Sequence, residues 1–237
     1  MLQLTDVNAS YGEIQVLKGI SLHVNKGEIV GVIGSNAAGK TTMLSCISGL
    51  IKPDIGSIIF KGISIEKKAP FDIVEMGLIQ TPEGRLLFPK LSVYENLRLG
   101  AYSKRSRLGW QERLNRVYEL LPKLRERASQ QAGSLSGGEA QMCAIGRGLM
   151  ADPEFIMFDE PSLGLAPIAV SEIMNLIRNI REQGVTVLLV EQNVRQTLSS
   201  ADRAYVIENG SIVLEGGGAE LINNSIVKKA YLGSLYG

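Results

Sequence analysis

The fold of this chain is decided by the stretch Gly34-Ser35-Asn36-Ala37-Ala38-Gly39-Lys40-Thr41-Thr42. It follows residues 28–33, which have the apolar character of a strand, and it precedes apolar residues at helical spacing in 43–50. A strand, a glycine-rich loop and a helix in this order present backbone N–H groups and a helix N-terminus to a phosphate. The sequence therefore predicts an α/β fold with a phosphate-binding loop.

The residues of this loop are expected to share the binding of a nucleotide polyphosphate and its metal ion. Gly34 and Gly39 allow the backbone to approach the phosphates closely, and Lys40 is expected to reach the β- and γ-phosphates. Thr41 is expected to place its hydroxyl on Mg²⁺. The remaining predicted contacts are Ser35, Asn36, Ala37, Ala38 and Thr42. A glycine-rich turn with a chance Lys-Thr pair is the alternative.

Ala37 stands where a third glycine is common in such loops. Alanine tolerates a positive φ poorly. Either this peptide has ordinary dihedral angles, or the loop carries a small strain.

A pair of acidic residues follows a second apolar run. Residues 155–158 are typical of a buried strand, and Asp159 and Glu160 come directly after them. We expect Asp159 to hold Mg²⁺ directly or through water, and Glu160 to polarise the water that attacks the γ-phosphate. A solvated turn would also place two acids here, but the phosphate loop upstream favours the catalytic interpretation.

A third motif begins a predicted helix. Ser136 and Glu139 fit a capping box, in which each side chain bonds the backbone N–H of the other residue. Capping does not explain Gly137 and Gly138, because each glycine in a helix costs about 1 kcal/mol relative to alanine. The glycines indicate that something approaches the backbone, which suggests a second anion site.

Length, charge and composition limit the class of protein. The 237 residues suffice for one large domain, and 25 basic against 24 acidic residues give no general attraction to nucleic acid or anionic lipid. No apolar run reaches the roughly 18 to 20 residues that span a bilayer, and the N-terminus lacks the features of a signal peptide. Cys46 and Cys143 are expected to be small buried residues of a reducing compartment. The sequence predicts a soluble cytoplasmic protein.

The order of the elements predicts a core with an insertion. Helical spacing prevails from about residue 91 to 150, between segments with strand character. We therefore expect one domain, 1–237, with a core formed by 1–90 and 151–237 and a helical subdomain at about 91–150.

The C-terminal part of the chain contains a strong hairpin signal. Residues 205–208 and 211–214 have strand character and are joined by Asn209-Gly210. This dipeptide favours the tight turn of an antiparallel hairpin.

Taken together, these motifs carry a resemblance. The stretch Leu135–Glu139, shortly before a strand that ends Asp159-Glu160-Pro161 and downstream of the phosphate loop, resembles the nucleotide-binding domain of ABC ATPases. The resemblance implies a P-loop NTPase core with an N-terminal antiparallel β subdomain and an inserted α-helical subdomain. It also implies ATP and Mg²⁺ as cofactors. In that family two domains pair head to tail, so Ser136, Gly137 and Gly138 would contact ATP held by the phosphate loop of the other domain.

Further residues match the family singly. Tyr11 lies at the position of the aromatic residue that stacks on adenine, although a strand-edge tyrosine is the alternative. Gln80 matches the glutamine that ligates Mg²⁺ and senses the transmembrane partner. Residues 161–166 match the loop that crosses the dimer interface.

Within the family, the chain resembles the LivF-type ATPases of bacterial branched-chain amino acid importers from Leu2 to Gly233. The stretches that carry this likeness are 81–85, 160–167 and 190–193. The resemblance implies permease partners, a LivG-like ATPase or a second copy as dimer partner, an indirect solute-binding protein, and a place on the inner face of the membrane. Importers of urea, amides or other amino acids use similar ATPases, so the solute stays open.

Two residues depart from the family pattern. Gln192 stands where a histidine usually contacts the γ-phosphate; its side chain can donate a hydrogen bond but cannot carry a charge. Ala166 stands where an aspartate usually follows the leucine of the interface loop, so communication through that carboxylate cannot operate. The only histidine, His23, alternates with apolar neighbours and is expected to face away from the core.

Other functional classes fit less well. The segment 104–127 holds eight basic and three acidic residues, which indicates a solvated helix face or a membrane-proximal surface. A nucleic-acid-associated ABC ATPase usually has tandem domains, long insertions or a basic bias, and this chain has none, so no nucleic acid partner is expected. A small-molecule kinase would not need the paired glycines at 137–138.

Overall fold

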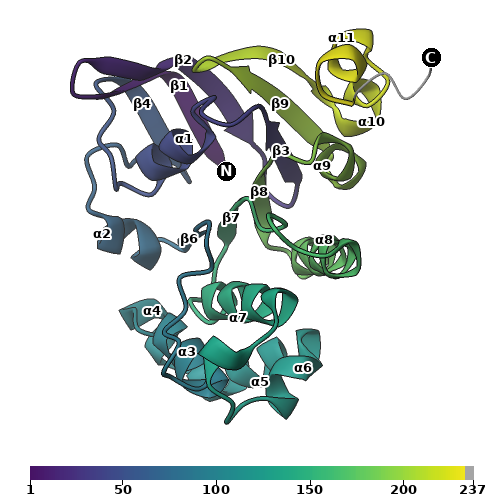
Figure 1. The fold of residues 1–237 in the computed structure, drawn as a ribbon. Coiled ribbons are helices and arrows are strands. Elements are labelled where there is room, and N and C mark those ends of the chain that lie inside the picture. Colours follow the sequence, from purple (N-terminus) through teal and green to yellow (C-terminus); the bar gives the residue numbers. More distant parts are fainter. Residues whose placement is uncertain (233–237) are drawn as a thin grey trace. The chain divides into compact units, whose positions relative to one another are not determined.

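The computed structural model describes residues 1–232 and divides the chain into two compact units (Figure 1). The first unit consists of Met1–Pro70 and the described residues from Thr186 onward, and the second is Phe71–Val185. Residues 233–237 of the predicted single domain, including Gly233 of the family resemblance, lie outside the described residues. The subdomain boundaries near residues 91 and 150 remain predictions.

Four strands of the first unit form an antiparallel sheet in the order β2-β1-β4-β5. They are β1 (Leu2–Tyr11), β2 (Ile14–Val24), β4 (Ile55–Phe60) and β5 (Ile63–Ser64). On β2, Leu22 and Val24 are buried while His23 between them is exposed. The prediction that His23 faces away from the core is therefore confirmed.

The same unit contains four further strands in the order β10-β9-β3-β8. They are β3 (Ile29–Ile33), β8 (Thr186–Glu191), β9 (Arg203–Glu208) and β10 (Ser211–Gly217). β3 is parallel to β8 and β9, and β10 is antiparallel to β9. Every residue of β3 and β8 is buried, as expected for parallel strands covered on both faces.

Short helices complete the first unit. They are α1 (Lys40–Ile47), α9 (Val194–Ser200), α10 (Gly218–Leu221), α11 (Ser225–Val227) and the π-helix η2 (Lys228–Leu232). Leu198 of α9 and Val227 of α11 join Ile33 and Val206 in one buried apolar cluster. The C-terminal helices are therefore anchored beside the strand that leads into the phosphate loop.

The predicted hairpin is confirmed. Asn209 and Gly210 have φ values of 48° and 83°, and Ser211 pairs with Glu208 across the turn. Two left-handed residues in a two-residue turn match the twist of the flanking strands.

The second unit combines two parallel strands with several helices. The strands are β6 (Leu78–Thr81) and β7 (Phe155–Asp159). The helices are α2 (Pro70–Glu75), α3 (Val93–Gly100), α4 (Lys104–Arg107), α5 (Trp110–Leu120), α6 (Pro122–Glu126), the 3₁₀ helix η1 (Ala132–Ser134), α7 (Gly137–Leu149) and α8 (Pro167–Glu182). Helix α3 packs closely on α7, because a Cβ atom at Gly100 would overlap the Arg147 carbonyl oxygen. Gly146 of α7 faces Leu97 and Val117 in the same way.

Most basic residues of the segment 104–127 are exposed, as expected for a solvated face, but Arg105 and Arg113 are not. Arg105 pairs with Glu154 at 3.0 Å, and Arg113 pairs with Asp152 at 3.2 Å. Arg113 is itself buried. These arginines hold α4 and α5 against the turn before β7, so part of the charge serves the packing of the unit.

Both cysteines are buried, as predicted. Burial raises the pKa of the Cys46 thiol to about 11, and it raises that of Cys143 to about 11. The thiols therefore stay protonated near neutral pH and behave as apolar core groups.

Candidate functional site

The phosphate loop of the first unit is built between a buried strand and a helix. β3 ends at Ile33, and α1 begins at Lys40 after Gly39, whose φ of 105° favours glycine. A Cβ atom at Gly34 would overlap the carbonyl oxygen of Ile207 on β9. The sequence assigned Gly34 to phosphate approach alone, but the packing of the loop on β9 also requires a glycine there.

The Lys40 side chain lies along the loop. It is 5% exposed, and its Nζ donates hydrogen bonds to the carbonyl oxygens of Gly34 at 2.8 Å and Ser35 at 3.0 Å. These bonds hold a buried ammonium group at the start of the loop. A group fixed in this way can meet polyphosphate charge without further ordering.

The sequence left open whether Ala37 has ordinary dihedral angles or a strained backbone, and the structure has the strained form. The φ of Ala37 is 62°, in the left-handed region. This conformation costs a residue with a Cβ atom about 1 to 2 kcal/mol. Strained backbone of this kind is common at ligand-binding loops, where the surrounding structure maintains it.

The turn of the C-terminal hairpin supports the loop. The Gly210 N–H donates to the Ala38 carbonyl oxygen at 3.0 Å, and the Lys18 N–H donates to the Gly210 carbonyl oxygen at 2.8 Å. A Cβ atom at Gly210 would overlap the Val16 carbonyl oxygen. The hairpin turn therefore packs between the phosphate loop and β2 and contacts both. The sequence indicated the turn but not this contact.

Gln192 and Tyr11 complete the predicted residues of the first unit. Gln192 is exposed and comes directly after β8, where Glu191 pairs with Ile33 of β3. Gln192 and Gly34 therefore leave neighbouring parallel strands at the same edge of the sheet. Tyr11 ends β1 with 55% of its surface exposed, which fits both an adenine platform and a strand-edge tyrosine.

The acidic pair of the second unit follows a strand, as the sequence predicted. All five residues of β7 are buried, including Asp159, which is 2% exposed. Glu160 comes next with a φ of 49°, so it leaves the strand in a left-handed conformation. The backbone thus turns sharply at Glu160, directly after the buried carboxylate.

Gln80 lies on the strand beside β7. It pairs in register with Met157, two residues before Asp159. Its Oε1 atom is buried and accepts no hydrogen bond from the described residues. A buried amide oxygen without a donor is costly unless a cation or water meets it, and such oxygens are good Mg²⁺ ligands.

Among the described residues, the predicted Mg²⁺ ligands by themselves do not form a complete metal cage. Within residues 1–232, no group of three or more His, Cys, Asp or Glu side chains could hold a metal ion. Mg²⁺ in nucleotide sites is usually held by one or two protein groups together with phosphate oxygens and water. The residue set therefore fits Mg²⁺ bound with a nucleotide.

The start of α7 forms the predicted capping box. The Glu139 N–H donates to Ser136 Oγ at 3.4 Å, and the Ser136 N–H donates to Glu139 Oε2 at 2.9 Å. The hydrogen bonds from the Ser136 backbone and side chain lower the pKa of Glu139, with a smaller contribution from Arg127. Ser136 is exposed, so the capped helix start is accessible to a ligand.

The two glycines of this turn differ in their environment. A Cβ atom at Gly138 would lie 3.0 Å from the Ala169 Cβ, so packing against α8 accounts for that glycine. A Cβ atom at Gly137 would lie 3.4 Å from the Arg85 guanidinium, an ordinary contact. Gly137 is exposed, and packing within the chain does not require it. Gly137 is therefore the glycine of this turn that leaves the backbone open to close approach by a ligand.

Comparison with known proteins identifies the family. The model of the family described as ABC transporter matches residues 17–163 of this chain. The chain belongs to the ABC transporter family. It is an ATPase subunit of a transporter, and ABC ATPases bind ATP, generally need Mg²⁺, dimerise and work with transmembrane permease components.

Two curated relatives cover nearly the whole of this ABC ATPase. It is 46% identical over 233 residues to the high-affinity branched-chain amino acid transport ATP-binding protein BraG of Pseudomonas aeruginosa, covering 98% of this chain and 100% of the relative. It is 37% identical over 240 residues to the lipopolysaccharide export system ATP-binding protein LptB of Escherichia coli K12, with 98% of each chain covered.

Solved structures confirm the predicted fold. The ADP conformation of MJ1267, an ATP-binding cassette of an ABC transporter, matches with a TM-score of 0.88 and 31% identity over 98% of this chain and 96% of that one. The dimeric cassette MJ0796 bound to ADP and Pi matches with a TM-score of 0.78 and 27% identity, over 92% and 98%. The P-loop NTPase core with an antiparallel β subdomain and a helical part is therefore confirmed.

The predicted site residues of this ABC ATPase fall into two groups. The first unit carries Tyr11, the loop from Gly34 to Thr42, and Gln192. The second carries Gln80, Ser136, Gly137, Gly138, Asp159 and Glu160. Within each group the structure places the residues at strand ends or at a helix start. Their individual roles are proposals.

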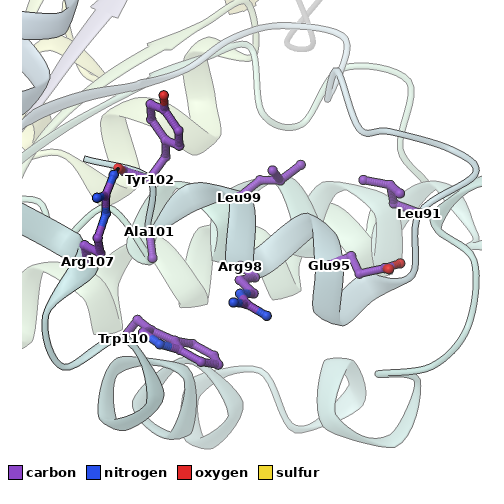
Figure 2. Close-up of a pocket in the computed structure, with 8 residues that line it drawn as sticks. All are labelled: Leu91, Glu95, Arg98, Leu99, Ala101, Tyr102, Arg107 and Trp110. Carbon is purple, nitrogen blue, oxygen red and sulfur yellow. Dashed lines mark hydrogen bonds between the residues drawn. The ribbon is translucent and has the colours of Figure 1, made fainter. Parts of the chain in front are cut away.

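The second unit also has a groove that is not lined by these residues (Figure 2). Its volume is about 470 Å³, and its lining includes Leu99, Tyr102 and Trp110. The Arg98 guanidinium lies 5.0 Å from the centre of the Trp110 ring. Tyr102 is 72% exposed, so the groove offers a partly aromatic surface outside the predicted nucleotide site.

None of the helices in residues 1–232 combines the length and apolar character that crossing a bilayer requires.

Proposed function

We propose that this chain is the ATPase subunit of an importer for branched-chain amino acids, of the LivF type. The observation that carries the proposal is the 46% identity to BraG over the full length of that relative. The chain would act at the inner face of the membrane, bound to permease subunits. A solute-binding protein would act with it only indirectly.

The residues support a division of roles in ATP hydrolysis. The loop from Gly34 to Thr42 would hold the phosphates, with Lys40 on the β- and γ-phosphates and Tyr11 against adenine. Thr41, Gln80 and Asp159 would hold Mg²⁺, which neutralises charge on the phosphates when it is bound. Glu160 would accept a proton from the attacking water, and Gln192 would donate a hydrogen bond to the γ-phosphate.

The partner in the ATP-bound dimer would be a LivG-like ATPase or a second copy of this chain. Ser136, Gly137 and Gly138 at the accessible start of α7 would contact nucleotide held by that partner. Support comes from the dimeric structure of the cassette MJ0796, because its structural match covers 92% of this chain. Ala166 precedes α8 without a side-chain cap, so this chain contributes no carboxylate at that point of the interface loop.

Lipopolysaccharide export is the second candidate, because LptB is 37% identical over 98% of the chain. The margin between the identities to BraG and LptB favours amino acid import. Import of urea, amides or other amino acids would fit the same ATPase.

Uptake in the chain's own organism tests the proposal. Deleting its gene is expected to abolish high-affinity uptake of labelled leucine, isoleucine and valine. The wild-type gene should restore uptake, and the Glu160→Gln variant should not. Normal uptake in the deletion strain together with defective lipopolysaccharide export would favour the second candidate and overturn the first.

Gln192→Ala is expected to lower ATP turnover by about one to two orders of magnitude, because a neutral donor at the γ-phosphate is lost. The measurement is phosphate release by the assembled transporter. The turnover rate of the wild type should show none of the pH dependence that a titrating imidazole would cause between about pH 6 and 7, because the glutamine side chain does not titrate. Unchanged turnover in the variant would remove Gln192 from this role.

A further inference from the structure

Helix α7 makes two neighbouring contacts with the segment that contains Gln80. Gly148 contacts the end of strand β6, and Arg147 contacts the loop that follows this strand. A Cβ atom at Gly148 would lie 2.9 Å from Thr81 Oγ1, so the helix backbone packs directly on the residue after Gln80. Thr81 is 3% exposed and its hydroxyl has no hydrogen-bond partner among the described residues. The contact is therefore close, and it leaves little space for the strand end to shift toward the helix.

The loop that follows has an unusual backbone. Gly84, Arg85 and Leu86 have φ values of 77°, 65° and 44°, so three consecutive residues are left-handed and two of them carry a Cβ atom. Each such residue costs about 1 to 2 kcal/mol relative to a right-handed conformation. Leu86 is 63% exposed, so burial of its side chain does not hold the loop in this shape. Another interaction must maintain it.

Arg147 of α7 supplies that interaction. Its Nη1 donates to the Leu86 carbonyl oxygen at 2.8 Å, and its Nη2 donates to the Arg85 carbonyl oxygen at 3.1 Å. The planar guanidinium thus binds two successive carbonyls at once, which an ammonium group cannot do with the same geometry. Burial lowers the pKa of Arg147, as expected for a guanidinium held inside this contact.

The same loop also reaches the other end of α7. The Arg85 guanidinium lies next to Gly137, where an added Cβ atom would be 3.4 Å from its Nη2. The backbone of this loop is therefore held at Arg147, while the side chain of Arg85 extends to the exposed start of the helix at Gly137. A cation at a helix N-terminus is not favoured by the helix dipole, so the dipole does not attract Arg85 to this position.

We infer that Arg147 is a positioning residue that clamps the loop after Gln80 onto α7, so that Gln80 and the start of α7 move as one body. The inference rests on the proposed role of Gln80 as an Mg²⁺ ligand. Gln80 would serve the nucleotide of its own chain, whereas Gly137 would serve that of the partner. The clamp would therefore link the two nucleotide sites of a dimer. Such a link matters in this chain because Ala166 replaces the aspartate through which the two sites usually communicate.

Arg147→Gln tests the clamp by metal binding and by hydrogen exchange. In the full chain carrying Glu160→Gln, so that ATP is not consumed, ATP binding is measured by fluorescence while Mg²⁺ is titrated. We expect the Mg²⁺ concentration for half-maximal binding to rise about tenfold, as when a group that orients a metal ligand is removed. ATP affinity without Mg²⁺ should change less than about twofold. Amide exchange of residues 84–88, read by mass spectrometry, should accelerate at least about tenfold.

Arg105→Gln, also in the Glu160→Gln chain, is the matched control. Arg105 is another partly buried arginine of this unit that bonds a backbone carbonyl, that of Asp152 at 3.1 Å. It lies at the opposite end of the strands, because its guanidinium lies next to Gly77, directly before β6. Its replacement should lower the melting temperature without changing the Mg²⁺ requirement. An equal rise in the Mg²⁺ requirement for both variants would overturn the inference.

Arg147→Lys keeps the charge and one hydrogen bond, so it provides a folded variant if Arg147→Gln does not fold. It should give a smaller rise in the Mg²⁺ requirement and a smaller acceleration of exchange. Wild-type values for both readouts would overturn the clamp. Gln80→Ala separates this inference from the proposed function. If that variant leaves the Mg²⁺ requirement unchanged, the metal role of Gln80 fails, while hydrogen exchange at 84–88 still decides whether Arg147 holds the loop.

Discussion

Glu160→Gln is expected to lower ATP turnover by at least about 100-fold while ATP binding is retained, because glutamine keeps the shape of the side chain but cannot accept the proton of the attacking water. Glu160 follows directly on the buried strand β7, and its φ of 49° sets the direction in which its side chain leaves the strand. Glutamine can adopt the same backbone conformation at a similar cost. The measurement is phosphate release, together with the size of the protein in ATP and in ADP by light scattering. ATP-bound dimers should accumulate in the variant, because the step that opens them is blocked.

Glu154→Gln provides the matched control for Glu160→Gln. Glu154 lies directly before the same strand and pairs with Arg105, 27% of whose side chain is exposed. Its replacement removes a charge of the same kind and should cost at most about 1 kcal/mol of stability. Turnover should remain close to that of the wild type. Full hydrolysis by Glu160→Gln would exclude Glu160 as the general base.

The parts of the site that could be predicted from sequence are those set by local rules. The phosphate loop, the capping box at Ser136 and the turn at Asn209-Gly210 each depend on residues within a few positions of one another. The buried strand before Asp159 was readable for the same reason, because an uninterrupted apolar run needs no distant partner to be recognised. Such features follow from backbone geometry alone.

Contacts between distant segments could not be predicted in this way. Gly138 was interpreted as a sign of ligand approach, but its neighbour Ala169 lies 31 positions along the chain on α8. The two carbonyls that Arg147 holds belong to residues 61 and 62 positions away. A single sequence gives the propensity of each segment but not which segments meet.

Ala37 shows a further limit. The sequence allowed ordinary dihedral angles or a small strain, and the structure has the strained form with a φ of 62°. Local propensity alone would favour the ordinary form. The surrounding loop decides otherwise, since the Ala38 carbonyl is fixed by a hydrogen bond from Gly210. The Ala38 N–H also donates to the Ser35 carbonyl oxygen at 3.2 Å, so the strained conformation is maintained by a turn within the loop together with a contact from the far end of the chain.

Gly210→Ala is therefore expected to have the second large effect. The added Cβ atom would overlap the Val16 carbonyl oxygen, and the φ of 83° is itself unfavourable for alanine. The turn would have to move away from β2, which would break the hydrogen bonds to Ala38 and from Lys18. We expect a loss of about 2 to 4 kcal/mol in the free energy of unfolding, from backbone strain and overpacking together.

ATP affinity should fall along with stability in Gly210→Ala, by about tenfold, because the phosphate loop loses the N–H that fixes its Ala38 carbonyl. Gly62→Ala is the matched control, since Gly62 has a similar φ of 78° in a hairpin turn of the same unit, with nothing within 4 Å of an added Cβ atom. It should lose only about 1 to 2 kcal/mol, the cost of left-handed backbone, and should bind ATP normally. Urea unfolding and equilibrium ATP binding measure the two effects. Equal losses of stability and unchanged ATP affinity in both variants would show that the hairpin turn does not support the phosphate loop. A loss of ATP affinity in Gly210→Ala alone would show that the C-terminal hairpin is part of the nucleotide site, although it is about 170 residues from the loop in sequence.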